Sequence, residues 1–115
     1  MLTKETTVDY LLDEMIEFRQ KIKQEKPQFI KNNDWFFKEV WLYPQPIERD
    51  TEVMRGVIVK KLRKDRNGDT YYVTLAENGE LYVDNDECVM GENREKIATY
   101  LHELREDLIA GGDIE

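Results

Sequence analysis

The only histidine of the chain lies in a segment with part of a zinc-binding helix motif. His102 is followed by Glu103, but a zinc peptidase helix needs a second histidine four residues after the first, because successive turns present two imidazoles to one metal ion. Glu106 occupies that position instead. We therefore predict no metal site, and we interpret His102 as a surface histidine beside an acidic residue.

The single cysteine offers little chemistry. Cys88 would act as a nucleophile only beside a base, and no spacing in the sequence brings it close to the one histidine. We predict that Cys88 is a small buried apolar residue. A lone cysteine cannot form a disulfide within the chain, which favours a reducing, cytoplasmic location. The sequence contains no serine, so a serine nucleophile is excluded.

Two acidic loops contain the residue types of calcium ligands without their spacing. An EF-hand loop needs glycine at position 6 and glutamate at position 12. Counted from Asp65, glycine comes at position 4 and position 12 is Ala76; counted from Asp84, position 6 is Val89. Turn formation explains both loops. Since no glycine-rich phosphate-binding motif is present either, we predict that the protein is not an enzyme and uses no cofactor.

The formal net charge of -8 over 115 residues is concentrated in the last third of the chain. Residues 1–76 include 13 acidic and 14 basic residues, whereas residues 77–115 include 12 acidic and three basic residues, a net charge of -9. Segment 60–66 has the opposite sign, because five of its seven residues are bases. These observations predict a bipolar surface with an acidic side and a basic loop.

The N-terminal segment 6–25 is predicted to be a helix, which Thr6 caps and Pro27 ends. Its apolar residues recur at intervals of three and four: Val8, Leu11, Leu12, Met15, Phe18 and Ile22. By its period this stripe extends to Phe29. We interpret it as one side of the domain core, and the alternative is a homodimer through the N-terminal helix.

Segment 35–43 contains five of the twelve aromatic residues. As a strand it would place Trp35, Phe37, Trp41 and Tyr43 on one face; as a short helix it would be capped by Asp34. The aromatic and β-branched content favours the strand, and both alternatives stay open. Its aromatic residues are interpreted as a core plug or, where exposed, as an anchor for a partner.

Three further β-rich segments follow along the chain: 53–62, 70–76 and 81–84. Asn67-Gly68 and Asn78-Gly79 separate them, and such pairs favour two-residue type I′ turns because both residues tolerate positive φ. The second turn would pair Ala76 with Leu81. In the matching register of the first hairpin, Lys60 falls on an apolar face, so we expect either a bulge there or partial cover on both faces.

A last helix is predicted from Arg94 to Ile109, with Asn93 as its cap. The fold class is therefore α+β, a two-layer sandwich in which an antiparallel meander of three to four strands is flanked by N-terminal and C-terminal helices, in the order α-β-β-β-β-α. We expect both helices on one face of the sheet. Residues 1–110 would form one domain, and residues 111–115 a flexible acidic tail.

The sequence predicts a small soluble acidic protein that acts as a non-catalytic interaction or regulatory module. Its partner would be a protein with a basic surface, which an acidic helix attracts. The predicted partner-binding residues are acidic side chains of the last helix and aromatic residues of segment 35–43: Glu95, Glu103, Glu106, Asp107, Trp35, Trp41 and Tyr43. No apolar run is long enough to span a membrane, and no membrane contact is expected.

Two alternative functions involve nucleic acids. In the first, the protein imitates a nucleic acid and inhibits a nucleic-acid-binding protein, as phage and mobile-element inhibitors do, with carboxylates in the place of phosphates. In the second, a basic hairpin binds RNA or DNA. Its contact residues would be Lys60, Lys61, Arg63, Lys64 and Arg66. The overall acidity of the chain argues against this second alternative.

Overall fold

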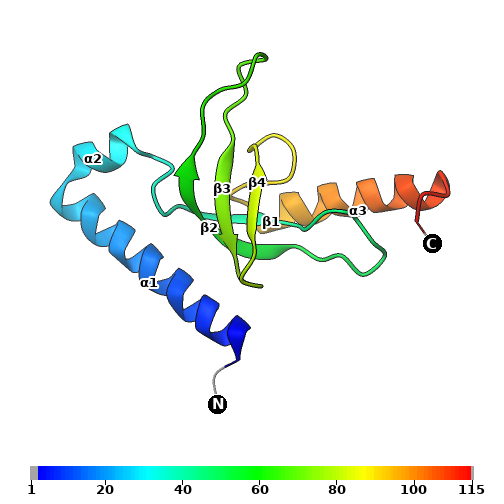
Figure 1. Cartoon of the computed structure of the whole chain (residues 1–115), viewed down its shortest axis with the longest axis horizontal. Coiled ribbons are helices and arrows are strands. Elements are labelled where there is room, and N and C mark those ends of the chain that lie inside the picture. The colour runs from blue at the N-terminus through cyan, green and yellow to red at the C-terminus, as the bar shows by residue number, and fades with distance from the viewer. Residues whose placement is uncertain (1–2, 115) are drawn as a thin grey trace.

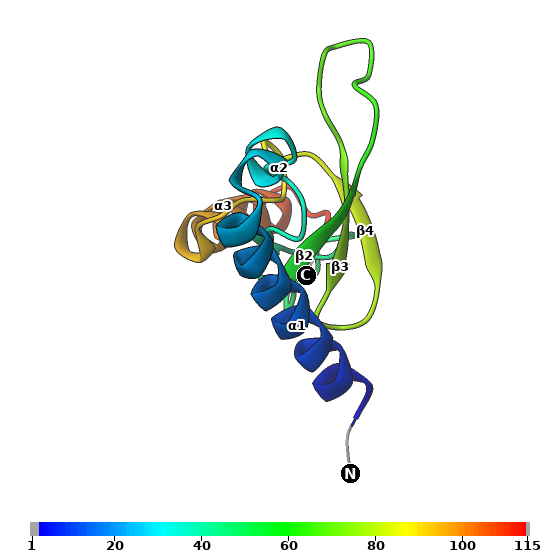
Figure 2. The same cartoon turned by 90° about the vertical axis from the view of Figure 1, so that its left-hand side faces the viewer.

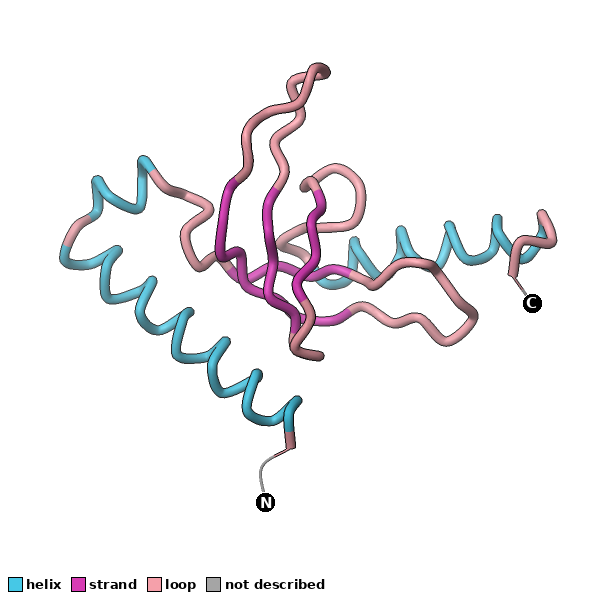
Figure 3. Tube along the Cα trace, viewed as in Figure 1, coloured by secondary structure: helices cyan, strands magenta, loops and turns pink. Residues whose placement is uncertain are grey.

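The computed structural model describes residues 3–114 of the chain, without the side chains of residues 4 and 5. Its elements are α1 (Lys4–Glu25), α2 (Pro27–Asn32), β1 (Glu39–Leu42), β2 (Met54–Lys61), β3 (Tyr72–Ala76), β4 (Leu81–Asp84) and α3 (Arg94–Ala110). In Figures 1 and 3 the sheet lies at the centre of the view, with α1 and α2 to its left and α3 to its right. The predicted α+β class and the predicted order of the elements are confirmed, with α2 as an addition.

The N-terminal region contains two helices where one was predicted. α1 begins earlier than expected, because Thr3 rather than Thr6 is the N-cap; its hydroxyl oxygen accepts a hydrogen bond from the Thr6 N–H at 3.1 Å. Pro27 follows the end of α1, as predicted, but it also starts α2. Proline suits the first helical position, where its missing N–H has no partner to lose.

Segment 35–43 is neither a continuous strand nor a helix. Residues 33–37 form a turn, and only Glu39–Leu42 form a strand. Phe37 has a φ of 50°, a left-handed conformation that bulky residues rarely adopt. This turn breaks the predicted alternation, so that Trp35 packs beside Val40 while Trp41 packs against a different cluster.

The four strands form an antiparallel meander in the order β1-β2-β3-β4, and both Asn-Gly turns differ from the prediction in the same way. Gly68 and Gly79 have φ values of 85° and 87°, but among the described residues neither asparagine has a positive φ. A type I′ turn needs positive φ at both central residues. Each tip is instead a three-residue loop that ends in glycine, and Leu75 rather than Ala76 pairs with Leu81.

The bulge expected in the first hairpin is present. The register between β2 and β3 shifts between Ile58 and Lys60, and Lys60 is exposed. At Gly56, strand β2 approaches both of its neighbours, β1 and β3, closely. A Cβ atom at this position would lie 2.6 Å from Thr74 Cγ2 and 2.9 Å from Leu42 Cδ2, so the close approach requires glycine.

Both terminal helices contact the same face of the sheet, as expected. Trp41 and Arg55 are register partners; Trp41 packs on the core cluster that α3 completes, and Arg55 binds carboxylates of α1. Figure 2 shows α3 and most of α1 on the same side of β3 and β4. On the opposite face, Met90 from the loop after β4 packs with Val40 and Ile58.

The outline of the molecule is flat and branched. Its extents are 52 × 46 × 21 Å, and its radius of gyration is 15.6 Å, against about 13 Å for a compact domain of this length. α1, α3 and the β2–β3 hairpin each project from the sheet (Figure 1). These three projections offer the most accessible surface for contacts with other molecules.

Candidate interaction surfaces

α3 is anchored to the sheet by its first half. Ile97 and Leu101 are its two buried residues, and they pack in one cluster with Tyr43 and Val89. Asn93 caps the helix as predicted, and its side chain accepts a hydrogen bond from the Lys96 N–H at 3.1 Å. The helix is therefore held along one side while the opposite side faces solvent.

The predicted acidic residues lie on the solvent side of α3. Glu95, Glu103, Glu106 and Asp107 are all exposed, and at 100° per residue they fall within an arc of about 120°, away from the buried residues. Of the residues between 3 and 114, none forms an ion pair with these four carboxylates. Within the described part of the chain, no direct ion pair therefore neutralises these carboxylates.

Two arginines of α3 are turned toward the rest of the molecule. The Arg105 guanidinium donates a hydrogen bond from Nη2 to the Thr51 carbonyl oxygen, which ties α3 to the loop between β1 and β2. The Arg94 guanidinium carbon lies 5.5 Å from the centre of the Trp41 ring, a cation–π distance. These contacts draw positive charge away from the acidic side of the helix.

The predicted basic residues lie on the projecting β2–β3 hairpin, and all five are exposed. The hairpin tip is ordered by Asp65, whose side chain accepts hydrogen bonds from the Asn67 and Asp69 N–H groups at 2.9 and 3.0 Å. Asp65 also raises the pKa of the Tyr71 hydroxyl. The two aspartates at the tip reduce the positive charge of this arm, which points away from α3 in Figure 1.

The aromatic residues predicted to meet a partner have different surroundings. Trp35 and Trp41 are half-buried, but Tyr43 is fully buried in the α3 cluster. This burial raises the pKa of Tyr43 to about 12. Tyr43 is therefore a core residue between β1 and α3 rather than an exposed anchor, and contact of this segment with a partner stays a prediction.

An aromatic cluster at the junction of α1 and α2 was not anticipated from the sequence. The Phe36 ring stacks on Phe37 at 4.2 Å and meets the edge of Phe29 at 5.3 Å. Phe18 lies 6.3 Å from Phe36. Beside this cluster, Phe18, Ile22, Lys26, Phe29 and Phe36 line an apolar groove of about 260 Å³. The continuation of the α1 stripe to Phe29 was the one sequence signal for this arrangement.

The outward face of α1 is unusually apolar. Leu11 and Phe18 are 44% and 47% exposed, and Phe29 of the adjoining α2 is 41% exposed. At the inner edge of the same apolar stripe, Leu12 is fully buried. α1 is further held by Arg55, which binds Asp9, Asp13 and Glu39 together. The stripe predicted from the sequence is thus only partly used by the core of the chain.

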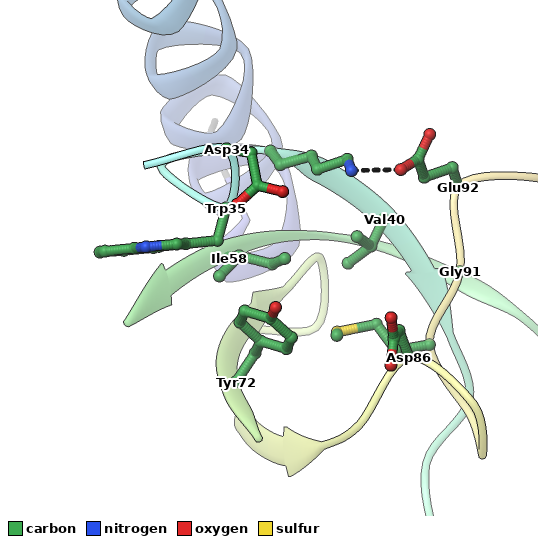
Figure 4. A pocket seen from close by; sticks show the side chains of 10 residues that line it. Asp34, Trp35, Val40, Ile58, Tyr72, Asp86, Gly91 and Glu92 are labelled. Atoms are coloured by element: carbon green, nitrogen blue, oxygen red, sulfur yellow. Dashed lines mark ion pairs between the residues drawn. The ribbon is translucent and has the colours of Figure 1, made fainter. Parts of the chain in front are cut away.

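A small pocket lies between the 33–38 turn and the loop after β4 (Figure 4). Its volume is about 100 Å³, and its apolar floor is formed by Val40, Ile58 and Met90. At its rim, the Lys38 ammonium forms an ion pair with the Glu92 carboxylate. The polar groups of the lining come from Asp34, Lys38, Tyr72, Asp86 and Glu92.

The single histidine and the single cysteine are both exposed. His102 is exposed on α3, with the exposed Glu106 one turn later. Cys88 is exposed, so its prediction as a buried apolar residue is wrong; the tight turn led by Asn85 presents it to solvent, with the Cys88 N–H donating to Asn85 Oδ1 at 2.8 Å. Within the described residues, no group of three or more His, Cys, Asp or Glu side chains is arranged to hold a metal ion.

One carboxyl group has a strongly shifted pKa. Burial raises the pKa of Asp84, the last residue of β4, from 3.8 to about 6. Desolvation is the cause of this shift. Asp84 is therefore a source of pH-dependent stability.

None of the helices described here has the length and apolarity needed to cross a membrane. The predicted tail over residues 111–115 stays a prediction, and its last residue lies outside the described part of the chain. A function must be argued from the surfaces described above, because comparison of the chain with protein-family models, curated proteins and solved structures gives no match.

Proposed function

We propose that the protein is a non-catalytic interaction module that binds a basic protein surface through the acidic side of α3. The observation that carries the proposal is the set of four exposed carboxylates on α3, none of which is paired with a base of the described chain. They lie on a helix that projects from the sheet (Figure 1), so a partner has access to them along its length.

The physical role of this surface would be to guide and orient a partner. Exposed charges add little binding energy individually because water and salt screen them. Together, they accelerate encounter with a surface of opposite charge and disfavour acidic partners. Binding through α3 should therefore weaken steeply as the salt concentration rises.

Charge reversal on α3 tests the proposal. The triple variant Glu103→Lys, Glu106→Lys and Asp107→Lys should lose partners that wild-type protein captures at low salt from a lysate of its source cells. A matched variant with Glu48→Lys, Asp50→Lys and Glu87→Lys changes the net charge equally on exposed loop residues. Capture that survives the first variant, or that fails equally in both, would contradict a role for α3.

A second candidate function is binding of RNA or DNA by the β2–β3 hairpin. It is supported by the exposure of all five bases on this projecting arm. A gel shift at low salt, with wild-type protein and with Lys60, Lys61, Arg63 and Lys64 all changed to Glu, measures it directly. If the protein instead competes with DNA for the partner captured through α3, the imitation of a nucleic acid by the helix is favoured.

We also propose that the protein self-associates through α1. Soluble monomers seldom leave several large apolar side chains exposed on one face, and α1 and α2 together expose Leu11, Phe18 and Phe29. Self-association would cover these residues while leaving α3 available to its partner. The two proposed contacts lie on different projections of the molecule (Figure 1).

A further inference from the structure

We infer that α1 pairs antiparallel with the α1 helix of a second copy of this chain. The inference rests on the self-association proposed above, and adds the orientation of the two helices and the residues in register. Three features of α1 carry it: the spacing of its exposed apolar residues, the groove beside its second half, and the placement of its charges.

The apolar stripe of α1, in which Leu11 and Phe18 are exposed and Met15 and Ile22 are half-buried, has the spacing of a coiled-coil seam. Leu11, Met15, Phe18 and Ile22 follow one another at intervals of four, three and four residues. Figure 2 looks onto α1 from outside, and no other element lies in front of it. A helix of 22 residues is about 33 Å long, which is long enough for several layers of side chains from a second helix.

The charges of α1 favour the antiparallel orientation. The exposed Glu14 lies in its first half, and the exposed Lys21 and Lys23 lie in its second half. A parallel pair would set the acidic half of one copy beside the acidic half of the other, with Lys21 facing Lys26 across the seam. Reversing one helix places the acidic Glu14 of each copy beside the basic Lys21 of the other.

One register satisfies both the apolar and the charged residues. When Met15 of one copy lies opposite Phe18 of the other, Leu11 lies opposite Ile22. In the same register Glu14 of each copy flanks Lys21 of the other, so the twofold axis makes the ion pair twice. Glu14 and Lys21 are both exposed and belong to none of the ion pairs within the described chain.

The apolar groove accommodates the second helix. Leu11 of the second copy, opposite Ile22, would enter the 260 Å³ groove that Phe18, Ile22 and Phe29 help to line. Filling it removes water from Phe18 and Phe29, the two most exposed members of the aromatic cluster. Burial of the groove supplies the affinity, and the two ion pairs select the orientation.

The mass of the full chain in solution is the first test. Size-exclusion chromatography with light scattering, over a range of protein concentrations, should give twice the chain mass of 13.8 kDa. Leu11→Asp should shift the protein to a monomer without loss of helical circular dichroism, because Leu11 is exposed and supports no internal packing cluster. A wild-type protein that stays monomeric at all concentrations overturns both the inference and the proposed self-association, and leaves the α3 proposal untouched.

A charge exchange tests the orientation separately. At low salt, Glu14→Lys or Lys21→Glu alone should weaken the dimer about tenfold, since each puts like charges together at two places. The double variant Glu14→Lys with Lys21→Glu should return to wild-type affinity. Glu17→Lys is the matched control, because Glu17 is exposed but lies outside the seam. A dimer that the exchange does not restore overturns the antiparallel register alone.

Discussion

α1 and α3 are both long helices that project from the same face of one sheet, but they differ in what they leave exposed. α3 presents carboxylates, with Tyr100 as its one strongly exposed large apolar residue in the described chain. α1 presents Leu11 and Phe18, among others. Water solvates the first surface readily and the second poorly. The type of residue that each helix exposes therefore distinguishes a projection that water covers well from one that the proposed second copy would cover.

The two helices also differ in how the sheet holds them. α3 is anchored by apolar contacts of Ile97 and Leu101. α1 is anchored by the buried Leu12 and by Arg55, which gathers carboxylates of α1 and β1. Apolar burial depends little on ionic strength, whereas interactions between partly exposed charges are screened by salt. Four predictions follow from this difference.

The largest effect is expected for the α3 anchor. Leu101→Ala removes a side chain that is 3% exposed, and should lower the free energy of unfolding by about 3 kcal/mol. Urea unfolding followed by circular dichroism measures this change, which should be the same at low and high salt. A loss that disappears at high salt would show that α3 is held by charge after all.

The α1 anchor should respond to salt. Arg55→Ala leaves Asp9, Asp13 and Glu39 without their shared partner and should lower the free energy of unfolding by about 2 kcal/mol at low salt. At 1 M NaCl the loss should shrink, since wild-type protein has then lost much of the same attraction. Hydrogen exchange should locate the change in α1 and leave protection of α3 intact. Equal loss of protection in both helices would contradict separate anchoring.

Asp84, at the end of β4, gives a pH-dependent prediction for the sheet that both helices contact. Because burial raises its folded pKa to about 6, its protonated form is favoured in the folded state. The contribution of Asp84 to the free energy of unfolding is therefore fully present below its unfolded pKa of 3.8 and is lost as the pH rises through 6. Asp84→Asn should stabilise the protein by about 1–2 kcal/mol at pH 8, allowing for partial exposure, and have little effect near pH 3. Thermal unfolding of both proteins across this range measures it, and a pH-independent difference would contradict the assignment.

The smallest effect on stability is expected at Cys88. It is exposed beside Val89, which belongs to the α3 cluster. A maleimide should label Cys88 in the folded protein at a rate close to that of a cysteine in a short peptide. Labelling should leave the free energy of unfolding unchanged within about 0.5 kcal/mol. Labelling that occurs only in urea would show that Cys88 is buried in the folded protein and that the turn after Asn85 differs from the one described here.

Regular segments with strong local signals could be predicted from the sequence. The cap at Asn93 and the strand at residues 81–84 match the structure, because asparagine caps and alternating apolar residues act over a few residues. The prediction failed where distant contacts decide. The positive φ at Phe37 turns the chain inside the aromatic segment, and the burial of Tyr43 depends on α3, more than fifty residues away.

Of the candidate surfaces, one could likewise be predicted from local sequence signals and one could not. Exposure of the α3 carboxylates follows from the period of its apolar residues, which assigns the other face to the core. The groove at the junction of α1 and α2 could not be foreseen, because it requires α2 and the turn at Phe37 to bring Phe36 beside Phe18. An apolar stripe indicates that a helix has a partner surface, but does not say whether that surface belongs to the same chain.

Gly56 offers a criterion for recognising distant relatives of this chain. Any side chain at this position would collide with Thr74 of β3 and Leu42 of β1. A sequence that keeps this close packing of β2 against its two neighbouring strands must therefore keep glycine at the equivalent position, while surface residues are free to diverge. A chain that has a glycine three residues before its β2 bulge, two Asn-Gly hairpins and flanking helices would be a candidate homologue even where overall identity is low.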